Sequence, residues 1–345
     1  TEFWVPRGYA HVIVDARGTG DSEGRYDLLG PDEQRDLCEV IEWVAGQPWC
    51  NGSVGMVGCS YFAMVQLLAA VNRPPSLKAI FPYDGATDPY REFYARGGAP
   101  TANWFSWLSQ VGMLNLRGSR VPDPSGIVDH ARSHLRHEHA IYDTYWQERS
   151  AEPRLGDIDI PTYFGCDWNF QDLHLRGAFE GWERVGDVPK RLLIGPRPEP
   201  FRVYSAYHGE ALRWYDCWLK ELDTGVMDGD PIQLYIPGRD VWRGEREGPL
   251  ARTQWRDFYL GSGVDAAAGT LGDQPGPDES RTWRFDPHSY DTIEGKPCLA
   301  YRSAPFDRAT EMTGHVALYL YLASTARDTD VYARLHDEAP DGTTR

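Results

Sequence analysis

A strand that turns at once into a helix constrains the fold of this chain more than any other feature. Residues 54–57 form a short apolar run, which Gly58 and Cys59 connect to Ser60. After Ser60 the apolar side chains recur on one helical face, at Met64, Leu67, Leu68 and Val71. A second apolar run, "LKAIFPY", follows at 77–83. Strand, helix and strand in this order predict a parallel sheet with crossover helices.

The same alternation extends in both directions along the chain. Before it, a strand is expected at 11–15 and a helix from about Pro31, which Gly46 and Pro48 stop. After it, strands are expected at 160–165 and 190–195, with helices from about His174 and from about Ala206 to Leu222. The sequence therefore predicts an α/β class.

Two regions depart from this pattern. Residues 86–152 are rich in aromatic side chains and read as a helical cap, inserted into a core made of 1–85 and 153–228. From 229 to 345 the helical patterns disappear, and short strands alternate with Gly, Pro and Asp. Regular short strands of this kind predict a β-sandwich or jelly roll.

Charge and cysteine usage limit the partners of the chain. The formal net charge of −16 over 345 residues disfavours nucleic acid and anionic membranes. Neither the six scattered cysteines nor the loop "RGTGDSEG" has the spacing of a metal site or a phosphate loop, so no cofactor and no metal are expected. Free thiols favour a reducing, cytoplasmic compartment, and homo-oligomerisation stays open.

The sequence allows two interpretations of Ser60. In a nucleophile elbow, a serine on a tight strand-to-helix turn exposes its hydroxyl, and its neighbours must be small. Gly58 fits this requirement, whereas Phe62 stands where the pattern G-x-S-x-G has its second glycine. The backbone N–H of Tyr61 would then bind an oxyanion. The alternative is an ordinary serine that caps the following helix.

Several long motifs resemble one family. The stretches "GYAHVIVDARGTGDSEG", "IEWVAGQPWCNGSVGMVGCSY", "LRWYDCWLKELDTG" and "TARDTDVYARLHDEAPDG" are similar to the cocaine-esterase / Xaa-Pro dipeptidyl-peptidase family of serine hydrolases. The resemblance implies an α/β-hydrolase core, a helical cap and a C-terminal jelly roll. It implies that Ser60 is the nucleophile, with Ala63 replacing the last glycine of the family motif. It also implies a fragment, because the family has an oxyanion tyrosine before Thr1 and more jelly roll after Arg345.

The acid and the base follow the nucleophile in this fold, in the order Ser, Asp or Glu, His. The resemblance implies an acid in the loop "CDWNFQDLHLRG", which offers Asp167 and Asp172. We prefer Asp172, although it could equally cap the next helix. The family's histidine follows "IGP".

In this chain the residues after "IGP" are Arg197, Pro198 and Glu199. None of these side chains can replace a histidine. The next histidine, His208, is therefore the predicted base, and His174 is the other candidate.

These residues predict a serine hydrolase that cleaves an ester or amide bond through an acyl-enzyme, with an esterase favoured. The expected partner is a small ester or peptide substrate. The alternative is a hydrolase-fold binding protein with impaired catalysis, because the family's histidine position holds no histidine.

Overall fold

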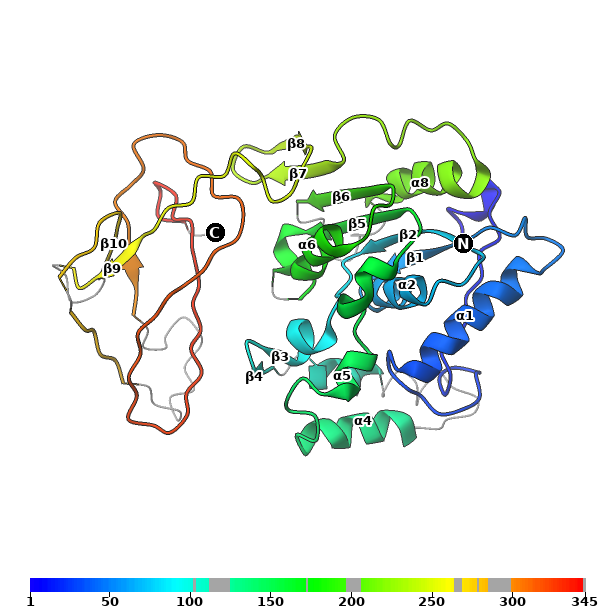
Figure 1. The fold of residues 1–345 in the computed structure, drawn as a ribbon, viewed down its shortest axis with the longest axis horizontal. Coiled ribbons are helices and arrows are strands. Elements are labelled where there is room, and N and C mark those ends of the chain that lie inside the picture. Colours follow the sequence, from blue (N-terminus) through cyan, green and yellow to red (C-terminus); the bar gives the residue numbers. More distant parts are fainter. Residues whose placement is uncertain are drawn as a thin grey trace. The chain divides into compact units, whose positions relative to one another are not determined.

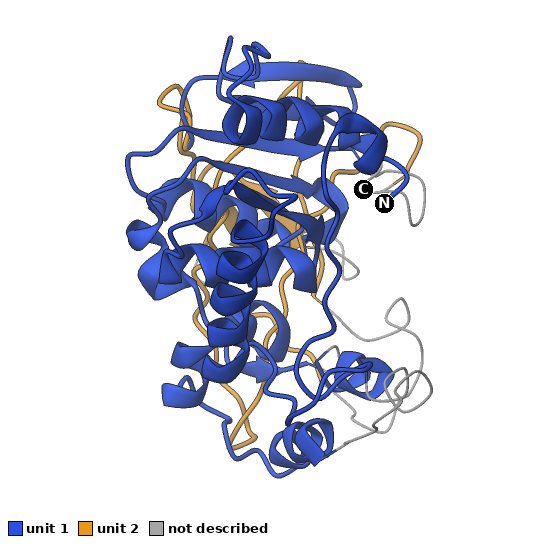
Figure 2. Ribbon diagram, turned by 90° about the vertical axis from the view of Figure 1, so that its right-hand side faces the viewer, with its two compact units in different colours: residues 1–248 blue, residues 249–345 orange. Residues whose placement is uncertain are grey.

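The computed structural model describes residues 1–101, 104–111, 125–171, 173–196, 206–263, 269–277, 279–284 and 299–343. They form two compact units, Thr1–Gly248 and Pro249–Arg345, which are coloured separately in Figure 2.

A six-stranded sheet forms the centre of the first unit (Figure 1). The strand order is β1-β2-β5-β6-β7-β8; the first five strands are parallel and β8 is antiparallel to β7. The predicted runs at 77–83 and 190–195 are confirmed as β2 and β6. The strands are β1 (Val54–Cys59), β2 (Leu77–Tyr83), β5 (Thr162–Asp167), β6 (Lys190–Gly195), β7 (Ile232–Ile236) and β8 (Val241–Glu245).

Buried side chains on the two faces of the sheet form two separate cores, because successive strand residues point to opposite faces. On β2, Ile80 belongs to one core and Phe81 to the other. The Ile80 core includes side chains of α1, α2 and α6, and the Phe81 core includes side chains of α8 and Trp4. The helices are α1 (Pro31–Ala45), α2 (Tyr61–Asn72), α6 (Leu175–Arg184) and α8 (His208–Lys220).

The region between β2 and β5 is mostly helical where it is described, as the sequence predicts. Residues 104–111 are helical, and the buried rings of Tyr94, Trp104 and Trp146 pack together. The cap as a separate domain at 86–152 stays a prediction. The other elements are η2 (Tyr90–Tyr94), β3 (Ala95–Arg96), β4 (Ala99–Pro100), α4 (Ser125–Leu135), α5 (Thr144–Glu148) and η3 (Glu152–Asp157).

The predicted strand at 11–15 is wrong. These residues have irregular backbone, and Ile13 is 76% exposed. A strand needs a hydrogen-bonded neighbour. Within the described part of the chain, β1 is an edge strand that pairs with β2 alone, so residues 11–15 do not extend the sheet.

The second compact unit, Pro249–Arg345, is smaller than the domain predicted at 229–345. Both β7 and β8 lie in the large sheet, although the predicted boundary assigns 229–345 to the second domain. The apolar run at 315–324, where the sequence favours one of the expected short strands, contains none. The described strands of this unit form one three-stranded sheet, so the jelly roll stays a prediction. They are β9 (Tyr259–Gly261), β10 (Gly269–Gly272) and β11 (Tyr301–Arg302).

Two further observations concern the helices and the cysteines of the described residues. Among the described helices, none combines the length and apolar character that a membrane crossing requires. The five described cysteines are free thiols: Cys38, Cys50, Cys59, Cys166 and Cys217.

Candidate active site

Ser60 has a strained backbone at the junction of β1 and α2. Its φ of 59° and ψ of −121° lie in a region that residues with a side chain rarely adopt. Its N–H donates to the carbonyl of Asp84 at 3.0 Å, which ties the turn to the end of β2. Its side chain forms no capping hydrogen bond with α2. A capping serine has extended backbone and bonds the first turn, so the nucleophile elbow describes this residue better.

Small neighbours allow this turn to close. Gly58 has a φ of 142°, and a Cβ atom at this position would overlap the side chain of Phe62. On the other side, a Cβ on Gly85 would lie 2.9 Å from that of Ala63, which is fully buried. Ala63 therefore meets the size requirement that the elbow sets three residues after the serine.

Ser60 lies in the lining of a pocket with a volume of about 270 Å³. The lining is mostly apolar and aromatic, and none of its described residues carries a charge at neutral pH. A pocket of this kind accepts an apolar group. The lining residues are Leu29, Ser60, Tyr61, Met64, Phe93, Trp104, Ser106, Trp107, Gln110 and Leu173.

Tyr61 contributes two different groups to this pocket. It is the first residue of α2, so its backbone N–H has no acceptor inside the helix and is available to an oxyanion. Its ring lies 6.0 Å from that of Trp107, and its hydroxyl donates to the buried carboxyl of Glu33.

Two buried carboxyl groups lie at the carboxyl ends of the strands that follow the nucleophile. Asp84 follows β2 and Asp167 ends β5. The Asp167 N–H donates to Asp84 Oδ1 at 3.3 Å, and the Tyr83 hydroxyl donates to Asp167 Oδ1 at 2.7 Å. Burial raises the pKa of Asp84 to about 7 and that of Asp167 to about 6. Asp84 is not among the site residues predicted from the sequence; its place directly after β2, the strand beside β1, is the signal that could have found it.

The predicted acid, Asp172, lies outside the described residues. The other candidate, Asp167, has no exposed surface, and its Oδ2 has no hydrogen-bond partner among the described residues. A buried carboxylate oxygen of this kind lacks a hydrogen-bond donor. Asp167 therefore remains an alternative acid that could accept an imidazole N–H, and the choice between the two stays a prediction.

His208 is the first residue of α8, and its ring stacks on Phe3 at 4.4 Å. It also meets Trp4 edge to face. Burial lowers the pKa of His208, and the charges of the N-terminus and Arg7 lower it further. The described lining of the Ser60 pocket does not include His208. However, the preceding residue, Tyr207, stacks on Tyr83 at 4.9 Å, beside Asp167. The catalytic role of His208 stays a prediction.

His174 lies nearer to the lining of this pocket but is almost completely enclosed. Its ring lies between Phe93 and Phe170, at 5.4 and 5.6 Å, and it is 2% exposed. Burial lowers its pKa to about 3. Such a histidine is neutral at pH 7 and a weak base, which favours a packing role.

The described residues hold no group of three or more His, Cys, Asp or Glu side chains that could bind a metal ion.

Comparisons with known proteins identify related chains. Residues 1–198 match the family model of the X-Pro dipeptidyl-peptidase S15 family, and residues 222–345 match its C-terminal non-catalytic domain. The second match begins close to the boundary predicted from the sequence. A cocaine esterase from Rhodococcus sp. (strain MB1 Bresler) is 27% identical over 98% of this chain and 71% of its own length.

Other relatives are longer than this chain. A Xaa-Pro dipeptidyl-peptidase from Lactobacillus helveticus is 25% identical over 55% of this chain and 27% of its own length. Among solved structures, a CocE/NonD family hydrolase from Staphylococcus aureus is 26% identical with a TM-score of 0.63, over 75% of this chain and 45% of that one. The chain thus spans about half the length of that structure. This likeness confirms the α/β-hydrolase fold.

Proposed function

The chain belongs to the X-Pro dipeptidyl-peptidase S15 family, and on this premise we propose that it is a serine hydrolase acting through an acyl-enzyme. The strained backbone of Ser60, without a capping bond, is the observation that carries the proposal. A chain tolerates such strain when it serves a purpose, and presenting a nucleophile is a well-known one.

The reaction would have two halves. The Ser60 oxygen forms a bond to the substrate carbonyl carbon while its proton passes to a histidine. The Tyr61 N–H donates to the resulting oxyanion. The histidine returns the proton to the leaving oxygen or nitrogen as its bond to carbon breaks. Water then attacks the acyl-enzyme, its proton passes to the histidine and on to the Ser60 oxygen, and a carboxylic acid leaves.

The pocket supports an ester with an apolar or aromatic group as the substrate. Its described lining offers the rings of Phe93, Trp104 and Trp107 and no charged side chain. A free peptide amino terminus is a cation that would need an acidic partner. Such a partner is missing from this lining, which favours an esterase over a dipeptidyl-peptidase.

Labelling with a fluorophosphonate probe tests the proposal. We expect stoichiometric labelling that Ser60→Ala abolishes. Ser106→Ala is the matched control, because this serine lines the same pocket in an ordinary helix; its labelling should persist. Absence of labelling in a folded chain would reject the proposal in favour of a hydrolase-fold binding protein.

The assignment of acid and base is part of the proposal. We take His208 as base and Asp172 as acid, with His174 and Asp167 as the alternatives. Labelling rates of His208→Ala, His174→Ala, Asp172→Asn and Asp167→Asn compare the members of each pair.

A further inference from the structure

Glu33 is a buried carboxyl group to which the hydrolase mechanism gives no role. It lies in the first turn of α1 and is 4% exposed. Its two oxygens have different partners: Oε2 accepts the backbone N–H of Leu29, and Oε1 accepts the hydroxyl of Tyr61. The side chain thus connects the loop before α1 to the first residue of α2.

Both partners of Glu33 are walls of the Ser60 pocket. Leu29 has a φ of 55°, which is unfavourable for a leucine and needs support from its surroundings. Tyr61 presents its ring to Trp107 and carries the N–H that faces the oxyanion. Replacing Glu33 therefore removes a hydrogen bond from two wall residues of the pocket.

We propose that Glu33 is a positioning residue that holds Leu29 and Tyr61 in place. It thereby sets the shape of the pocket and the direction in which the backbone N–H of Tyr61 points. The catalytic part of this inference rests on the proposed serine hydrolase. The pocket-shaping part does not depend on it, because ligand affinity can be measured without turnover.

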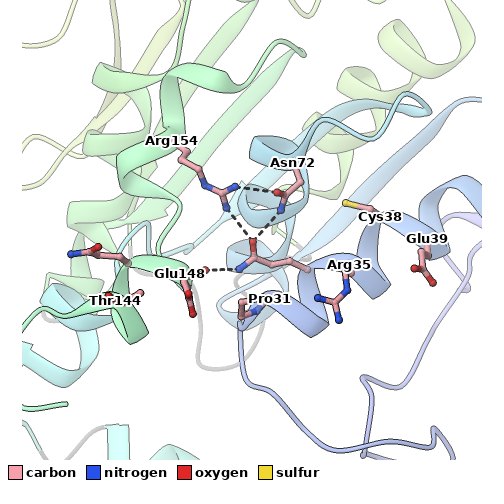
Figure 3. Close-up of a pocket in the computed structure, with 10 residues that line it drawn as sticks. Pro31, Arg35, Cys38, Glu39, Asn72, Thr144, Glu148 and Arg154 are labelled. Carbon is pink, nitrogen blue, oxygen red and sulfur yellow. Dashed lines mark hydrogen bonds between the residues drawn. The ribbon is translucent and has the colours of Figure 1, made fainter. Parts of the chain in front are cut away.

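The next residue in the helix is a natural comparison. Gln34 is 6% exposed and also contacts Leu29, to whose carbonyl oxygen its amide donates at 2.9 Å. Its oxygen accepts hydrogen bonds from Asn72 and Arg154, at 3.0 and 3.1 Å, beside a second cavity of about 690 Å³ (Figure 3). Gln34 therefore shares the helix, the burial and the loop contact of Glu33, but none of its hydrogen bonds reaches Tyr61.

The protonation of Glu33 adds a second signature. Burial raises its pKa to about 8, opposed by the Leu29 hydrogen bond. The charged groups that act on it are Asp27 and Asp36, which raise the pKa, and Arg149, which lowers it. The carboxyl is thus mostly neutral at pH 7. Ionisation above pH 8 places a negative charge behind Tyr61, close to the site where the oxyanion develops, and opposes the reaction.

The experiment compares Glu33→Ala, Glu33→Gln and Tyr61→Phe with the matched control Gln34→Ala. The first readout is the affinity for 4-nitroacetophenone, an aromatic ketone that cannot be hydrolysed, measured by quenching of tryptophan fluorescence. The second readout is the rate of fluorophosphonate labelling between pH 6 and pH 9.5. Thermal unfolding of each variant accompanies both.

We expect Glu33→Ala to weaken ketone binding several-fold and to slow labelling by roughly tenfold, because the pocket walls and the N–H lose their support. Tyr61→Phe should do the same to a smaller extent. Gln34→Ala should leave both quantities within about twofold of the parent, even where it lowers the unfolding temperature. Glu33→Gln can accept from Leu29 and donate to the Tyr61 oxygen, so it should restore labelling at pH 7. It should also remove the decline that the parent shows above pH 8.

Equal effects of Glu33→Ala and Gln34→Ala would overturn the inference, since the burial and the Leu29 contact that the two residues share would then explain both. A parent that binds the ketone but is not labelled would reject the serine hydrolase and leave the comparison of affinities intact. If Glu33→Ala does not fold, Tyr61→Phe, which removes only one hydroxyl, decides by the same affinity readout. Parent-like affinity of Tyr61→Phe would then overturn the inference.

Discussion

The two halves of the proposed catalytic site are built in different ways. The nucleophile half, at the ends of β1 and β2, is held by short contacts: Ser60 is tied to Asp84, and Ala63 lies against Gly85. The predicted acid and base belong to the segments that follow β5 and β6. There Asp172 lies outside the described residues and His208 packs against Phe3 and Trp4. A nucleophile elbow is a local structure, whereas an acid and a base must be brought to it by long loops.

The largest effect should come from the base, because it acts on every turnover. We expect His208→Ala to slow fluorophosphonate labelling by about 10²–10⁴-fold, since removing a general base leaves the serine unactivated. His174→Ala should change the rate far less, because a histidine whose pKa burial lowers to about 3 carries little of the proton transfer. If His174→Ala slowed labelling more than His208→Ala, the base would be His174, in the loop that also offers the acid. The two halves would then not differ in the way that we infer.

The second effect concerns the elbow itself. Gly58→Ala places a methyl group against Phe62 on a backbone with a φ of 142°. We expect this variant to lose most of its labelling and about 1–3 kcal/mol of unfolding free energy, measured by urea denaturation.

Gly52→Ala is the matched control for this change. Its φ is 87°, but among the described residues no atom beyond its own chain neighbours lies within 4 Å of the added methyl group. Gly52→Ala should also lose unfolding free energy through backbone strain, but it should still be labelled. Full labelling of Gly58→Ala would show that the turn tolerates a side chain and that the nucleophile half is less tightly built than we infer.

The sequence predicts well the features that depend on residues close together in the chain. Gly58 and the family resemblance favoured a nucleophile elbow at Ser60, and the apolar runs located β2 and β6 to the residue. It failed where a structure depends on a distant partner. Residues 11–15 have strand composition but no neighbouring strand, and β7 joins the large sheet because β6 lies beside it. Glu33 is an ordinary acidic residue of a first helical turn until its contact with Tyr61 is seen.

A third effect should appear as a change of stability with pH. The pKa of Asp84 is about 7 and that of Asp167 about 6, both above the usual values. The folded chain therefore binds more protons than the unfolded chain between about pH 4 and pH 7. The stability from this pair is fully present below the unfolded pKa and is lost as the pH rises through the folded values.

Replacing Asp84 isolates this contribution from the other carboxylates. Asp84→Asn should reduce the loss of unfolding free energy between pH 4.5 and pH 7.5 by on the order of 1 kcal/mol. Asp159→Asn, at an exposed ion pair with Arg73, should leave that difference unchanged. If the unfolding free energy of Asp84→Asn depended on pH as that of the parent does, the buried carboxyl of Asp84 would not lower stability at neutral pH.

The smallest effect should come from the aromatic wall, which neither half of the chemistry uses directly. Trp107→Leu removes a ring that packs on Tyr61 and Trp104, at 6.0 and 5.8 Å. We expect the KM for a phenyl-substituted ester to rise several-fold, with kcat nearly unchanged, because the ring binds ground state and transition state alike. The KM for an acetyl ester should stay constant, and Trp43→Leu, at a ring that is 60% exposed, should change neither value. A fall in kcat would instead show that Trp107 holds Tyr61 in place. The nucleophile half of the site would then include a residue of the predicted cap.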